Sequence, residues 1–127
     1  MKKIIQTSQA PAPVGPYNQA IQHNGTLYVS GQIALDPATG ELVQDSIEAE
    51  THRVLKNIGA ILTAAGIGFE DVLKCSVFVS DMGNYGRINA VYAEYFGEEN
   101  APARELVEVA NLPKYVNVEI SVIAAVA

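Results

Sequence analysis

The chain has 127 residues, a length that suits one domain with one core, and 49% of its residues are hydrophobic. Its formal net charge is −6, with 8 lysines and arginines among 14 acidic residues, so it lacks the basic face that nucleic-acid binding requires. One cysteine excludes a disulfide within the chain, and the first residues lack the apolar region of a signal peptide. No apolar run approaches the roughly 20 residues of a membrane span, so we expect a cytoplasmic protein without a membrane or nucleic-acid partner.

The first part of the chain is predicted to form an extended arm and a β-hairpin. Residues 9–16 contain three prolines, which exclude a helix or a central strand, so an ordered arm is expected to end at Tyr17. Residues 17–23 and 26–33 are predicted strands. They are joined at Asn24-Gly25, a dipeptide typical of two-residue hairpin turns.

A turn and a long helix are expected next. Residues 36–40 combine a proline, which presets φ, with a glycine, which accepts positive φ. The 3.6-residue spacing of apolar side chains predicts a helix over residues 46–65, with Asp45 as its cap, Glu48 completing a capping box and Gly66 ending it. The apolar stripe comprises Val54, Leu55, Ile58, Ile61, Leu62 and Ala65.

The second half of the chain is predicted to contain three more strands and one more helix. Residues 71–80 alternate as a strand, and residues 84–96 form an amphipathic helix that Gly97 ends. Residues 103–109 and 116–125 are the last two predicted strands. The apolar face of the first of these strands comprises Leu73, Cys75, Val77 and Val79, and that of the helix comprises Ile88, Val91, Tyr92, Tyr95 and Phe96.

The predicted order is β-β-β-α-β-α-β-β, an α+β fold over residues 1–127, in which one of the three strands before the first helix has no assigned residue range. Two helices on one face of a mixed six-stranded sheet make a two-layer sandwich. The other face of the sheet then lacks a covering layer. In a chain with only 17% charged residues, a second subunit is the expected cover.

Arg104 and Glu119 lie on the last two predicted strands and form the main candidate for a reactive pair. Strict alternation over residues 116–122 places Glu119 on the face opposite to the apolar one. If residues 110–115 connect the two strands as a hairpin, Arg104 lies opposite Ser121 and diagonal to Glu119, about 7–8 Å apart at Cα.

Such a pair has a chemical use. A guanidinium binds a carboxylate through two parallel hydrogen bonds and so orients it. A glutamate one diagonal step from Arg104 then orients or deprotonates a water molecule aimed at the carbon next to that carboxylate. The alternative is a salt bridge across the sheet with no function. Glu108 shares the face of Arg104 and is the second candidate for its partner.

Short motifs along the chain resemble, in the same order, those of the RidA/YjgF family. They span residues 9–124; each motif is weak by itself, and together they are specific. The motifs are Gly15-Pro16-Tyr17-Asn18-Gln19-Ala20, Val29-Ser30-Gly31-Gln32-Ile33, Asp36-Pro37-Ala38-Thr39-Gly40, Asn89-Ala90-Val91-Tyr92, Pro102-Ala103-Arg104, Val107-Glu108-Val109-Ala110, Leu112-Pro113-Lys114 and Val118-Glu119-Ile120.

The resemblance implies a chorismate-mutase-like homotrimer with three sites in the clefts between subunits. It implies hydrolysis of 2-iminopropanoate and 2-iminobutanoate to 2-keto acids and ammonia, without a metal or an organic cofactor. In this reaction Arg104 binds the substrate carboxylate and Glu119 positions the attacking water. The other positions implied to bind substrate are Tyr17, Ser30, Gly31, Asn89 and Leu106, with backbone groups at Gly31 and near Leu106 holding the imine nitrogen or the water.

Two positions depart from the family pattern. Relatives commonly carry Ser or Thr and then Cys directly after the arginine, whereas this chain has Glu105 and Leu106. Strand alternation is expected to point Glu105 away from Arg104, and to point Leu106 into the site, where it favours a larger or more apolar imine side chain. The segment before the arginine, residues 98–102, is also shorter than in many relatives.

The remaining reactive residue types have structural explanations. Cys75 is expected to be an inert core residue, because it lies on an apolar strand face. His23 borders a hairpin turn, and His52 lies on the more polar side of a helix. Neither histidine has a metal-ligand spacing to another His or Cys, so no metal is expected.

Two other functions remain open. A non-catalytic regulator would use the same pocket to bind a keto acid or a short fatty acid. An endoribonuclease is a label often attached to the family, but the acidic composition argues against it.

Overall fold

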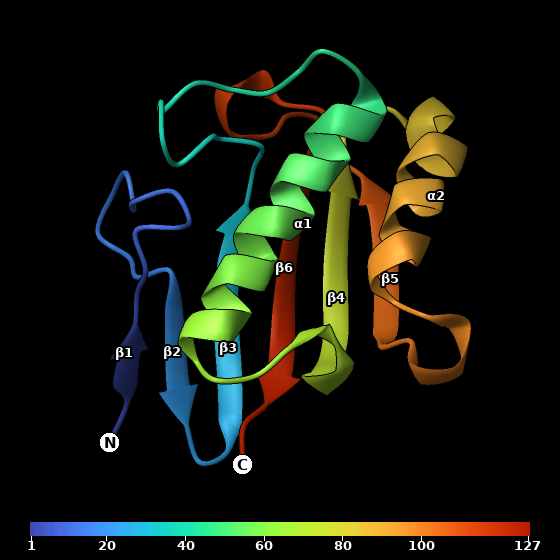
Figure 1. Cartoon of the computed structure of the whole chain (residues 1–127). Coiled ribbons are helices and arrows are strands. Elements are labelled where there is room, and N and C mark those ends of the chain that lie inside the picture. The colour runs from blue at the N-terminus through green and yellow to red at the C-terminus, as the bar shows by residue number, and fades with distance from the viewer.

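Six strands form one mixed sheet, and two helices cover one of its faces (Figure 1). The computed structural model describes all residues, 1–127, and confirms the predicted α+β sandwich. Its elements are β1 (Lys3–Ile5), β2 (Ala20–His23), β3 (Thr26–Gln32), α1 (Ile47–Ala64), β4 (Val72–Val79), α2 (Tyr85–Tyr95), β5 (Ala103–Glu108) and β6 (Val118–Ala125). No helix is both long enough and apolar enough to cross a membrane.

The strand order is β1-β2-β3-β6-β4-β5. Strands β4 and β5 are parallel, and every other neighbouring pair is antiparallel. The predicted hairpin of β2 and β3 is confirmed, with Asn24 and Gly25 both at positive φ in its turn. The last strand, β6, is therefore central, and β5 lies at an edge of the sheet (Figure 1).

The predicted hairpin of β5 and β6 is wrong. Strand β4 lies between them, and Arg104 pairs with Cys75 while Glu119 pairs with Phe78. Because Cys75 and Phe78 are an odd number of positions apart on β4, Arg104 and Glu119 point to opposite faces of the sheet. The alternation of β6 correctly predicts which of its residues face the helices, but alternation does not specify which strand is the neighbour.

The two helices follow the predicted apolar stripes with small shifts at their ends. Ser46, not Asp45, caps α1, because its Oγ accepts a hydrogen bond from Ala49 N at 3.0 Å. Glu48 completes no capping box and instead accepts two hydrogen bonds from Arg87 of α2, at 2.7 and 2.9 Å. The pKa of Glu48 is lowered to about 2, chiefly by the hydrogen bond from Arg87.

The core lies between the helices and one face of the sheet. The alternate residues of β6 that were predicted to be apolar and inward, Val118, Ile120 and Val122, are buried against α1 and its neighbours. The prediction that Leu73 belongs to the apolar face of its strand is wrong. Leu73 is 54% exposed, and it lies at a register shift between Val72 and Lys74. The predicted stripe of α1 is buried at Val54, Leu55, Ile58, Ile61 and Leu62.

The face of the sheet away from the helices is uncovered in one chain. Tyr28 and Val107 on this face are 50% and 41% exposed. Lys74 and Glu105 also lie on this open face, where their side chains form a salt bridge of 3.1 Å. Apolar groups without a cover are thus mixed here with polar groups that are already paired.

Candidate functional site

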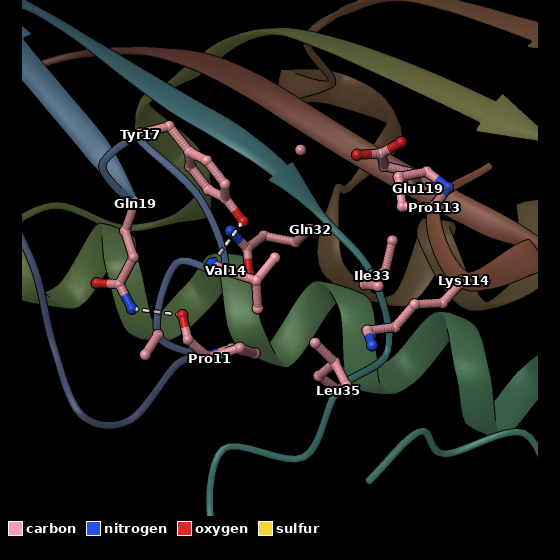
Figure 2. Close-up of a pocket in the computed structure, with 12 residues that line it drawn as sticks. Pro11, Val14, Tyr17, Gln19, Gln32, Ile33, Leu35, Pro113, Lys114 and Glu119 are labelled. Atoms are coloured by element: carbon pink, nitrogen blue, oxygen red, sulfur yellow. Dashed lines mark hydrogen bonds between the residues drawn. The ribbon is translucent and has the colours of Figure 1, made fainter. Parts of the chain in front are cut away.

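A cavity of about 130 Å³ lies where the N-terminal arm meets the end of β3 and the loop before β6 (Figure 2). Glu119 supplies its only carboxylate and Lys114 its only ammonium group. Apolar side chains of the arm and of the segment after β3 complete the lining. The residues that line it are Pro11, Ala12, Val14, Tyr17, Gln19, Gly31, Gln32, Ile33, Leu35, Pro113, Lys114 and Glu119.

The arm is held in place by one buried amide, that of Gln19. Its Nε2 donates to the carbonyl oxygens of Pro11, Thr7 and Ala10 at 2.8, 3.0 and 3.2 Å, and its Oε1 accepts from Thr7 N at 2.7 Å. Only 3% of Gln19 is exposed. Because proline-rich segments have few internal hydrogen bonds, this side chain supplies the contacts that make the arm a cavity wall. Sequence reasoning noted Gln19 only as part of a motif.

Tyr17 ends the arm and faces the cavity. Its hydroxyl accepts a weak hydrogen bond from Val14 N at 3.4 Å, which folds the arm back on itself (Figure 2). Ser30 lies close by on β3 but is not part of the cavity lining. Its Oγ donates to Asn18 O at 2.6 Å, so this side chain ties β3 to the segment after the arm.

Glu119 packs directly against the backbone of Gly31. The ladder between β3 and β6 shifts register between Val29 and Gln32, and this bulge contains Gly31. A Cβ on Gly31 would lie 2.9 Å from Glu119 Cδ, so only glycine leaves room for the carboxyl group. Glu119 has no hydrogen bond or salt bridge to the rest of the chain, and its burial raises its pKa above the ordinary value of a glutamate.

The loop before Glu119 is strained and is anchored by a buried carboxylate. Lys114 and Tyr115 both have left-handed backbones, with φ of 55° and 54°. Glu50 of α1 is fully buried and accepts hydrogen bonds from Asn117 N and Nδ2, both at 2.8 Å, and from Val118 N at 3.3 Å. Glu50 therefore fixes where β6 begins and how Glu119 enters the cavity.

Arg104 lies on the other side of the sheet, against α2. Its Nη1 donates to Asn89 Oδ1 at 2.8 Å, and its Nη2 donates to the Tyr85 hydroxyl at 3.1 Å. The guanidinium carbon is 4.7 Å from the centre of the Tyr92 ring and 5.8 Å from that of Tyr85. Arg104 is thus held by one helix face and is free of any carboxylate of its own chain.

Leu106, Glu105 and Glu108 have separate environments. Leu106 is half-buried on the same face as Arg104 and packs against the core. Glu105 points to the open face of the sheet, away from Arg104 as predicted, where Lys74 and Ser76 bind it. Glu108 accepts from Met82 N at 2.7 Å and so holds the turn before α2.

The predicted site residues therefore fall into two groups, to which the structure adds Lys114, Tyr85 and Tyr92, residues that the sequence did not predict to bind substrate. The acid half-site consists of Tyr17, Gly31, Lys114 and Glu119. The arginine half-site consists of Tyr85, Asn89, Tyr92 and Arg104. The interpretation of Arg104 and Glu119 as neighbours within one chain is wrong, because the half-sites lie on opposite faces of the sheet with β4 between them.

The remaining titratable groups take part in ordinary packing. Cys75 is fully buried, and burial raises the pKa of its thiol to about 11, so it is a poor nucleophile. His52 bonds the Tyr95 hydroxyl through Nδ1 at 2.8 Å, on the outer face of the helices. No three His, Cys, Asp or Glu side chains gather in a way that suits a metal ion.

Comparisons with known proteins agree over almost the whole chain. The profile of the family described as Endoribonuclease L-PSP matches residues 7–126. A RutC family protein, slr0709 of Synechocystis, is 55% identical over 96% of this chain and 95% of its own. A mouse protein named 2-iminobutanoate/2-iminopropanoate deaminase is 45% identical over 98% of this chain and 91% of its own. The crystal structure of a putative endoribonuclease from Thermotoga maritima has a TM-score of 0.96 and 48% identity, covering 100% of this chain and 99% of that one.

Proposed function

Because the chain belongs to the Endoribonuclease L-PSP family, also called RidA/YjgF, we propose that it hydrolyses 2-imino acids to 2-keto acids and ammonia. The substrates proposed are 2-iminopropanoate and 2-iminobutanoate. The name of the mouse relative, 45% identical to this chain, supports this choice. The observation that carries the proposal is an unpaired glutamate in a small cavity together with an arginine that no carboxylate of the chain neutralises.

The active site is proposed to form between subunits of a homotrimer. Within one chain Arg104 and Glu119 cannot reach the same ligand, because the sheet separates them. Arg104 lies on β5, at the edge of the sheet, where a second copy has access to it. The open face with Tyr28 and Val107 supplies an apolar surface for that copy to cover. Each cleft would then combine the acid half-site of one subunit with the arginine half-site of the next.

The reaction follows from the chemistry of the two half-sites. Arg104 binds the substrate carboxylate and orients the C=N group. Glu119 takes a proton from a water molecule as the water oxygen bonds to C2, which gives a tetrahedral carbinolamine. The same carboxyl group passes this proton to the nitrogen and then carries the hydroxyl proton of the carbinolamine to the nitrogen as well. The C=O bond forms as the C–N bond breaks, and ammonia and the 2-keto acid leave. The raised pKa of Glu119 suits a group that must both accept and donate the proton.

The other predicted binding residues have supporting roles in this scheme. Asn89 holds the guanidinium through its Oδ1, and Ser30 ties the strand that carries Gly31. The Gly31 backbone and the Tyr17 ring border the space beside the carboxyl group of Glu119. Leu106, on the same face as Arg104, is proposed to contact the side chain of the imine.

An imine-trapping assay coupled to an amino-acid dehydratase tests the reaction. The wild-type protein is expected to remove the imine before the trap reacts. Arg104→Ala and Glu119→Gln are each expected to lower the rate by roughly 10²-fold or more. An Arg104→Ala variant as fast as wild type would contradict the mechanism. Tight keto-acid binding without imine turnover would indicate a regulator instead, and RNA cleavage that survives purification would indicate a ribonuclease.

A mixing experiment tests whether the site is shared between subunits. Arg104→Ala and Glu119→Gln chains are unfolded, mixed in equal amounts and refolded together. If each cleft takes its arginine and its glutamate from different subunits, one of the three clefts in every mixed trimer regains both residues, which is about one quarter of all clefts after random reassembly. Activity near one quarter of wild type is then expected. No regain of activity in verified mixed trimers would contradict a site that takes its arginine and its glutamate from different subunits.

A further inference from the structure

Tyr85, the first residue of α2, places a hydroxyl group beside the edge of Arg104. Its oxygen accepts a hydrogen bond from Arg104 Nη2 at 3.1 Å, and its side chain is partly exposed. Because the arginine is the donor, the hydrogen of the hydroxyl group is not used in this contact. Tyr85 donates to no other group of the chain, so an O–H donor remains available next to the guanidinium.

The contacts of Arg104 within the chain decide how many of its N–H donors remain free to bind a ligand. A guanidinium carries five N–H groups, of which the bonds to Asn89 and Tyr85 use two and leave three. The Tyr92 ring covers one face of the group at 4.7 Å. Three N–H groups of Arg104 and the O–H of Tyr85 therefore have no partner in the chain and are available to a ligand.

No neighbouring charged side chain interferes with the binding of an anion at Arg104. Arg87, two residues further along α2, is occupied by Glu48 at 2.7 Å. The carboxylates of Glu105 and Glu108 are bound to other groups, Lys74 and Met82 N respectively. An anion that approaches Arg104 thus meets a cation and a hydroxyl donor without a competing acid.

We propose that Tyr85 is a substrate-binding residue whose hydroxyl donates to the same carboxylate that Arg104 binds. The inference rests on the proposed function, because it assumes a 2-imino acid at Arg104. A carboxylate has enough lone pairs for the arginine fork and one more donor. The third hydrogen bond strengthens binding of substrate and product without taking part in the proton transfers.

The test compares Tyr85→Phe with wild type, with Arg104→Ala, and with Tyr95→Phe as a matched control. Tyr85→Phe keeps the ring and removes only the hydroxyl. Tyr95 lies on the same helix, and its hydroxyl contacts His52 instead of the arginine. Calorimetry with 2-oxobutanoate gives Kd, and the coupled assay with 2-iminobutanoate gives KM and kcat. For Tyr85→Phe we expect Kd and KM to rise about tenfold, the size of one hydrogen bond to a charged group, with kcat within about twofold.

The possible outcomes separate the inference from the proposed function. If Arg104→Ala loses both keto-acid binding and imine turnover while Tyr85→Phe binds and turns over like wild type, Tyr85 is not a binding residue and the proposed function stands. If Arg104→Ala binds and turns over substrate like wild type, the proposed function falls and the inference falls with it. A fall in kcat and in melting temperature for Tyr85→Phe, without a change in Kd, would assign Tyr85 to folding and overturn the inference.

Discussion

The acid half-site and the arginine half-site hold their charged groups by opposite means. Glu119 has no hydrogen-bond partner in the chain and is positioned by packing against Gly31 and by burial. Arg104 is positioned by two hydrogen bonds and two aromatic rings of α2. The difference matches the roles proposed for them: a group that exchanges protons must be free to titrate, whereas a group that binds a carboxylate must keep its charge and direction.

The two half-sites also differ in what supports them. The acid half-site depends on buried polar side chains that tie irregular segments to the core, Gln19 for the arm and Glu50 for the start of β6. The arginine half-site depends on one regular helix. Substitutions near Glu119 are therefore expected to disturb both folding and activity, whereas substitutions near Arg104 act mainly on binding.

The largest expected effect is on activity, from Gly31→Ala in the acid half-site. The new Cβ overlaps the end of the Glu119 side chain, which must rotate away from its place in the cavity. We expect kcat/KM to fall by roughly 10²-fold, with a folded protein by circular dichroism. Gly86→Ala on α2 is the control, because nothing lies within 4 Å of its Cβ, and it should keep full activity. Equal activity of the two variants would show that the packing of Glu119 on Gly31 does not matter.

The next effect is on stability, from Glu50→Ala. Removal of this carboxylate leaves Asn117 N, Asn117 Nδ2 and Val118 N without their acceptor in a buried position. We expect the free energy of unfolding in urea to fall by about 3 kcal/mol, and by about 1 kcal/mol for Glu50→Gln, which keeps one acceptor. Glu48→Ala, on the exposed side of the same helix turn, should change stability little. A Glu50→Ala variant as stable as Glu48→Ala would contradict this account of the anchor.

A smaller effect concerns pH. Burial raises the pKa of Glu119, so folding favours its neutral form. This stabilisation is fully present below the ordinary glutamate pKa and is lost as the pH rises through the raised value. Glu119→Gln should therefore match wild type in melting temperature near pH 4 and melt slightly higher at pH 7, while losing activity at both. A variant that melts lower than wild type at pH 7 would mean that the charged form is stabilised instead.

The smallest effect is expected in the loop that leads to Glu119, from Tyr115→Gly. Tyr115 has φ of 54°, a conformation that costs an L-residue about 1–2 kcal/mol and costs glycine little. The higher entropy of unfolded glycine offsets part of the gain, so we expect about 0.5 kcal/mol of added stability in urea unfolding. The side chain is 82% exposed, so little packing is lost within the chain. A destabilised variant would indicate that Tyr115 contacts another subunit.

Local signals along the chain predicted every α-helix and strand except β1, and they predicted the site only in part. The hairpin at Asn24-Gly25, the stripe of α1 and the alternation of β6 each depend on residues a few positions apart. The half-site members Tyr17, Gly31 and Glu119 lie together, although they are distant in sequence. Gln19 and Glu50 were not singled out, because a buried polar residue resembles an exposed one until its partners are known.

The sequence by itself determined the element types, the two-layer α+β class and the face on which Glu119 lies, because side-chain periodicity is a local property. Only the tertiary structure decided that β6 inserts between β3 and β4 and that β5 pairs with β4 at the edge of the sheet. Alternation specifies a face and not a neighbour, and a strand with Arg104, Glu105 and Glu108 suits an edge better than the centre. That choice of neighbour moved Arg104 to the helix side, away from Glu119.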